Sequence, residues 1–114
     1  MLRRSPDPCA AVTFGAMCEQ IKTAIAESLK SHPSVASAWG FGSFFRGEDY
    51  HDIDILVVIE ATNGRLLDIS RAIRTTLLRI EHTIGTSIDL IILTETEFES
   101  RPLRDMDQLV RITA

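Results

Sequence analysis

The chain lacks any apolar run long enough to cross a membrane. Its longest apolar stretches, Ile55–Ile59 and Leu90–Leu93, have the length of single strands, whereas a membrane-spanning helix needs about 20 apolar residues. The N-terminal stretch Met1–Pro8 is polar, and the apolar segment of a secretion signal does not follow it. We therefore expect a cytoplasmic protein with no membrane partner.

Cysteine and positive charge are also scarce. The only two cysteines, Cys9 and Cys18, have neither CxxC spacing nor a histidine cluster beside them, so the sequence indicates neither a zinc site nor a disulfide framework. Lys and Arg total 12 against 16 Asp and Glu, and the net charge is -4. Because nucleic-acid binding needs clustered Lys and Arg, we do not expect nucleic acid to be the main substrate.

Two segments carry the apolar periodicity of helices. Within Phe14–Leu29 and Leu66–Ile84, apolar residues recur every three or four positions, which places them on one helix face. Pro33 restricts the residue before it, so we expect the first helix to end ahead of it. Gly85 follows the second segment directly and is positioned as its C-cap.

Three strands alternate with these helices, and two shorter elements follow. Apolar and β-branched runs predict strands at Val35–Phe41, Asp52–Glu60 and Ser87–Leu93. Thr94 and Glu97 form a capping box for a short helix, which Pro102 would end. The stretch Leu109–Thr113 predicts a final edge strand.

This order of elements predicts an α+β fold with two layers, in which helices pack against a mixed β-sheet. Apolar residues make up 45% and charged residues 25% of the chain, the balance of a soluble globular protein. The length of 114 residues fits one domain. We expect a single domain over residues 1–114, with residues 1–12 as the segment most open to disorder.

Three aspartates interrupt the apolar strands. Side chains alternate along a strand, so Asp52 and Asp54 share one face and Ile53 points to the other. If the strand of Asp89 pairs beside them, a third carboxylate joins, and the three repel one another unless a cation neutralises them. Mg²⁺ or Mn²⁺ prefers such oxygen ligands together with phosphate oxygens. Alternatively, the first two are solvated residues and Asp89 is a stray edge charge.

The turn Gly40–Gly47 precedes the acidic strand and holds the other candidate residues. Gly42 would allow a phosphate to approach the backbone closely, and the hydroxyl of Ser43 would supply a donor. A Gly-Ser pair is also common in turns that bind nothing. Arg46 either reaches a phosphate or braces the loop by pairing with an acid at position 48 or 49.

Taken together, Gly40-Phe-Gly-Ser-Phe-Phe-Arg-Gly47 followed by Asp52-Ile-Asp-Ile-Leu-Val57 resembles the signature of the polymerase-beta-like nucleotidyltransferase superfamily, especially its minimal, MNT-type branch. The motifs cover Trp39–Val58, and the family's third acid on a later strand extends the resemblance to Asp89. This sequence departs from the family in its short connection from Gly47 to Asp52 and in His51, where serine is more usual.

The resemblance implies a nucleotidyltransferase-like fold and a division of labour among the candidate residues. Gly42 and Ser43 would hold the triphosphate, and Asp52 and Asp54 would ligate Mg²⁺ or Mn²⁺. Asp89 would act as a further metal ligand or as the base that activates the acceptor hydroxyl. The reaction would be nucleotidyl transfer with pyrophosphate leaving.

Larger superfamily members hold the second substrate in an additional helical region, whereas this chain ends soon after Asp89. We therefore expect a small acceptor or one brought by another chain. Minimal domains of this type accompany HEPN-family toxins, and the resemblance implies ATP as donor and a tyrosine of such a toxin as acceptor. Two alternatives remain: an aminoglycoside-type nucleotidyltransferase that acts as a homo-oligomer, and a non-catalytic antitoxin module that binds its partner. Retention of three clustered acids favours catalysis.

Overall fold

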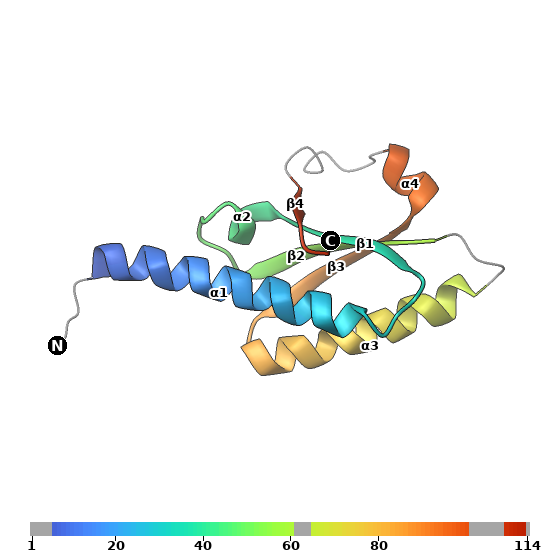
Figure 1. The fold of residues 1–114 in the computed structure, drawn as a ribbon, viewed down its shortest axis with the longest axis horizontal. Coiled ribbons are helices and arrows are strands. Elements are labelled where there is room, and N and C mark those ends of the chain that lie inside the picture. The colour runs from blue at the N-terminus through green and yellow to red at the C-terminus, as the bar shows by residue number, and fades with distance from the viewer. Residues whose placement is uncertain (1–5, 61–64, 101–108, 114) are drawn as a thin grey trace.

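The computed structural model describes residues 6–60, 65–100 and 109–113, and it describes side chains from residue 17 onward. Four helices and four strands follow one another along this part of the chain (Figure 1). In chain order they are α1 (Pro6–Leu29), β1 (Val35–Phe41), α2 (Gly42–Phe45), β2 (Asp52–Ile59), α3 (Leu66–Ile84), β3 (Ser87–Thr94), α4 (Glu95–Ser100) and β4 (Val110–Arg111).

The two long helices lie where apolar periodicity predicts them. Helix α3 has the predicted bounds, and Gly85 caps it in the left-handed conformation, with φ of 73° and its amide 2.8 Å from the carbonyl of Glu81. Helix α1 begins at Pro6 rather than at Phe14. Proline suits the first helical turn and alanines favour helix even without an apolar stripe. Residues 6–12 therefore have a helical backbone, and residues 1–5 lie outside the described residues.

The sheet has the order β3-β2-β1-β4. Strand β2 runs antiparallel to β1 and parallel to β3, and β4 pairs antiparallel with β1. A parallel pair needs a crossover, which α3 supplies between β2 and β3. The mixed sheet confirms the predicted fold class. Its predicted final strand is also present, although it spans only Val110–Arg111.

Apolar side chains cover both faces of the central strand β2. One face packs under α1 and α3, where Ile53, Ile55 and Val57 are fully buried. The opposite face buries Leu56 and Val58. Figure 1 shows α1 and α3 on one side of the sheet and α4 on the other. Because only the start of β2 carries acids, any polar site on this strand has to lie at that end.

Short-range contacts fix the remaining elements. Thr94 and Glu97 form the predicted capping box at the start of α4: the Glu97 amide donates to Thr94 Oγ1 at 3.2 Å, and the Thr94 amide donates to Glu97 Oε1 at 2.9 Å. Pro102, the predicted end of this helix, lies outside the described residues. Cys18 packs against the core as a half-buried thiol, and burial raises its pKa. None of the described helices is long and apolar enough to span a membrane.

Helix α3 offers a matched pair of leucines that tests the packing. Leu77 is 2% exposed and Leu78 is 52% exposed. We expect Leu77→Ala to lower the free energy of unfolding by about 2–5 kcal/mol, because it removes buried methyl groups and leaves a cavity. Leu78→Ala should change it by no more than about 0.5 kcal/mol. Urea unfolding in dilute solution measures both, and equal effects would contradict the packing described.

Candidate active site

The structure brings the three predicted acids to one face of the sheet. Burial of Ile53 and Ile55 under the helices turns the side chains of Asp52 and Asp54 to the opposite face. Asp54 pairs in register with Asp89 of β3, and neighbouring strands lie about 4.8 Å apart. Asp54 is half-buried, while Asp52 and Asp89 are exposed. The carboxylates of Asp54 and Asp89 thus lie side by side on adjacent strands. Asp52 lies two residues before Asp54 on the same face of β2.

Gly42 lies directly against one of these carboxylates. It is the first residue of α2, immediately after Phe41, which pairs with Asp54 across β1 and β2. Its φ is 80°, and a Cβ atom added there would lie 2.0 Å from Oδ2 of Asp54. Only glycine accommodates both the backbone conformation and this contact. The sequence analysis explained glycine at position 42 by the close approach of a phosphate. The structure shows a second explanation, which is the close approach of the Asp54 carboxylate.

A set of aromatic contacts holds this turn in place. Phe44 is fully buried, and its ring meets those of Phe45 and Tyr50 edge to face, at centroid distances of 5.0 and 4.8 Å. A Cβ atom on Gly40 would lie 2.3 Å from the Phe45 ring, so that ring packs over the glycine. The turn expected at Gly40–Gly47 therefore contains a short buried helix, α2. The adjacent Phe44 and Phe45 were the signal for burial that sequence reasoning missed.

Arg46 and Ser43 stabilise the end of the same turn. The Nε atom of Arg46 lies 3.1 Å from Oε1 of Glu48, and both side chains are exposed. Of the two alternatives for Arg46, the structure thus contains the ion pair within the loop, with Glu48 as the partner. An exposed ion pair of this kind contributes little to stability. The Ser43 carbonyl accepts hydrogen bonds from the amides of Arg46 and Glu48 at 3.2 and 3.0 Å. Phosphate binding by Ser43 and Arg46 stays a prediction. His51 is exposed.

The acids fit a metal ion that arrives with a phosphate ligand. Across the described residues, no three His, Cys, Asp or Glu side chains form a group that could hold a metal ion by themselves. Mg²⁺ commonly binds through one or two carboxylates and fills its remaining positions with water and substrate phosphate. Asp52 and Asp54 supply such a pair on one face of β2, and Asp89 of β3 lies beside Asp54. The donor set therefore suits a metal bound together with substrate rather than a closed structural site.

Two glycines with a positive φ test the contact at Asp54. Gly42 and Gly85 have φ of 80° and 73°, but a Cβ atom on Gly85 would meet nothing within 4 Å. We expect Gly85→Ala to cost about 1 kcal/mol of stability from its strained φ alone. Gly42→Ala should cost more and weaken Mn²⁺ binding, because it displaces the Asp54 carboxylate. Thermal unfolding and Mn²⁺ titration measure these effects. Equal losses in the two variants, with Mn²⁺ binding retained, would show that the contact is unimportant.

Comparisons with known proteins agree with this geometry. The family model described as polymerase beta, nucleotidyltransferase matches residues 23–110, which include α2 and all three acids. Among solved structures, the chain is similar to a Sulfolobus solfataricus protein described as a nucleotidyltransferase. The two are 24% identical, the match covers 97% of this chain and 89% of that one, and the TM-score is 0.55. This second likeness shows the fold alone, and a comparison with curated proteins finds no match. The chain belongs to the polymerase beta nucleotidyltransferase family.

Proposed function

We propose that this domain transfers a nucleoside monophosphate, AMP from ATP, to a hydroxyl group on a partner protein in a metal-dependent reaction. The observation that supports it most is the pairing of Asp54 with Asp89 beside the turn at Gly42 and Ser43. In a family of nucleotidyltransferases, this arrangement provides carboxylates for a metal next to backbone that can face a triphosphate.

The proposed reaction is an in-line displacement at the α-phosphorus. The acceptor oxygen forms a bond to that phosphorus, the bond from the phosphorus to the oxygen bridging to the β-phosphate breaks, and pyrophosphate leaves. Asp89 takes the proton of the acceptor hydroxyl, and Gly42 and Ser43 position the triphosphate. A divalent metal held by Asp52 and Asp54 would neutralise the phosphates and stabilise the charge on the leaving group.

An acceptor on another protein fits the exposure of the acids. Asp52 and Asp89 are both exposed, and β3 lies at the edge of the described sheet. A hydroxyl group on a protruding side chain can therefore reach Asp89 from solvent without entering a closed pocket. Following the resemblance to the MNT-type branch, we propose a tyrosine of a HEPN-type toxin as the acceptor and an antitoxin role for this domain.

Replacing the acids tests the proposed roles. We expect Asp54→Asn and Asp89→Asn each to reduce transfer by at least about 10²-fold, because the first removes a metal ligand and the second the general base. Both variants should keep the fold, since each relieves like-charge repulsion. Asp68→Asn, at an exposed acid in the first turn of α3, is the matched control and should retain activity. Transfer of label from α-labelled ATP in Mg²⁺ or Mn²⁺ measures all three, and full activity of Asp54→Asn would refute the assignment.

The acceptor is identified by where the label appears. The purified domain is incubated with labelled ATP, the product of the adjacent gene and, separately, an aminoglycoside. Label on a tyrosine of the partner protein supports the proposal. Label on the aminoglycoside instead favours the small-molecule enzyme, and tight partner binding with no label on either favours a non-catalytic module. Either of the last two results would overturn the proposed acceptor.

A further inference from the structure

Helix α3 carries the large apolar side chains that are exposed in the described part of the chain. They belong to Leu66, Leu67 and Leu78, and the last two are more than half exposed. Other residues of α3 supply its buried contacts, so packing within the described chain does not account for leucine at positions 67 and 78. Single apolar residues scattered over a surface need no explanation, whereas exposed apolar residues grouped on one element indicate a surface that binds a partner.

Two of these leucines belong to a stripe on the exposed side of α3, which consists of Leu67, Arg71, Arg74 and Leu78. The four residues follow one another at steps of four, three and four, so they lie on one face of the helix. At about 1.5 Å per residue, the stripe is roughly 16 Å long. Both arginines are exposed, and neither guanidinium group forms an ion pair or a hydrogen bond within the described residues. Two unpaired positive charges thus lie between two exposed leucines.

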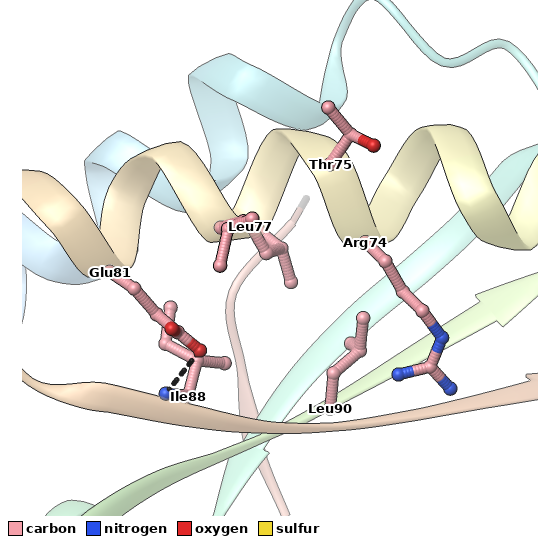
Figure 2. Close-up of a pocket in the computed structure, with 7 residues that line it drawn as sticks. Arg74, Thr75, Leu77, Glu81, Ile88 and Leu90 are labelled. Carbon is pink, nitrogen blue, oxygen red and sulfur yellow. Dashed lines mark hydrogen bonds between the residues drawn. The ribbon is translucent and has the colours of Figure 1, made fainter.

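The stripe borders a groove between α3 and β3, which is lined by Arg74, Leu77, Leu78, Glu81, Ile88 and Leu90, among others. Figure 2 shows Arg74 extending from α3 toward β3 beside Leu90, with Glu81 at the other end of the groove. The Glu81 carboxylate already accepts a hydrogen bond from the amide of Ile88 at 2.9 Å. The groove therefore has apolar walls, a negative charge that is engaged within the chain and a positive charge that is not.

We propose that the stripe and the groove beside it bind a helix of another protein, on which acidic side chains lie between apolar ones. Two carboxylates three or four residues apart on that helix would pair with Arg71 and Arg74, and apolar residues beyond them would cover Leu67 and Leu78. Arginine suits such pairs, because its guanidinium group binds a carboxylate through two parallel hydrogen bonds. Recognition of an amphipathic helix by a groove uses anchors at this spacing.

Charge and geometry favour this partner over three others. A second copy that packed its own stripe symmetrically against this one would bring arginines close to arginines, and like charges repel. An extended strand would have to pair along β3, where the carboxylates of Glu81 and Glu97 occupy outward amides. Phosphates of a nucleic acid would pair with the arginines but leave the leucines in water. An acidic amphipathic helix satisfies both kinds of residue.

The proposed surface is separate from the acidic face. Helix α3 covers one side of the sheet (Figure 1), and the side chains of Asp52 and Asp54 point to the other. A partner bound to the stripe therefore leaves these acids accessible. The inference rests on the exposed residues of α3 and does not depend on the proposed function, so binding is measured without nucleotide or metal.

A synthetic peptide tests the surface on the intact chain. The peptide is rich in alanine and glutamine, about 20 residues long so that it forms a helix, and carries leucine, glutamate, glutamate and leucine at steps of four, three and four. A control peptide has lysine in place of both glutamates. We expect saturable shifts of the amide resonances of residues 67–78 in the isotope-labelled chain, with at least about tenfold weaker binding of the lysine peptide.

Several outcomes of this titration would overturn the proposal. They are the absence of saturable shifts, shifts confined to other elements, and equal affinity for the two peptides. The same resonances shifting with the concentration of the chain alone would assign the stripe to self-association instead. Tighter binding of a single-stranded oligonucleotide at these residues would assign it to nucleic acid.

Charge reversal supplies matched variants. We expect the double variant Arg71→Glu, Arg74→Glu to bind the glutamate peptide at least about tenfold more weakly than the parent and to bind the lysine peptide more tightly. A variant that merely unfolds cannot produce this exchange of preference. Arg79→Glu is the control, because Arg79 is an exposed arginine of the same helix that lies outside the stripe, and it should keep the parent's preference. If the double variant kept that preference too, the proposed surface would be wrong.

Discussion

The close contact between Gly42 and the Asp54 carboxylate is the constraint on which the acidic face depends. Asp54 lies on β2, and Phe41, the last residue of β1, pairs with it. Helix α2 begins at the next residue, Gly42, so its first residue lies beside Asp54. A side chain at position 42 would occupy the place of Oδ2. The positions of the turn and of Asp54 therefore depend on each other. This contact is a steric reason for the family motif to combine a Gly-Ser with an Asp-x-Asp.

The buried part of β2 determines where on the strand the acids can lie. Strand β2 is packed on both faces from Ile55 to Ile59, so a charged group there would have to lose its water without compensation. The strand becomes accessible only at its beginning, where Asp52 is exposed and Asp54 half-buried. Parallel pairing with β3 then places Asp89 at the same level as Asp54. The hydrophobic core thus confines the carboxylates to one end of the sheet and brings them together there.

Much of this arrangement could be predicted from the residues, for physical reasons that differ between elements. Helix α3 has a clear apolar stripe and a glycine cap, and both are local signals, so its bounds matched the prediction. The common face of Asp52 and Asp54 follows from strand alternation alone. Helix α2 was missed because four residues carry no periodicity, and its stability comes from tertiary contacts of Phe44. The contact of Gly42 with Asp54 joins residues far apart in sequence, and no local rule could reveal it.

Strand β3 combines two tasks that make different demands on an edge. It must stay in register with β2 to keep Asp89 beside Asp54, and it must also resist uncontrolled pairing with other strands. Glu81 and Glu97 meet both demands, because each carboxylate occupies an outward amide and ties the strand to a flanking helix. The same two contacts limit the open edge to its middle. The contacts that hold the acidic face in register therefore also hinder another strand from pairing along this edge.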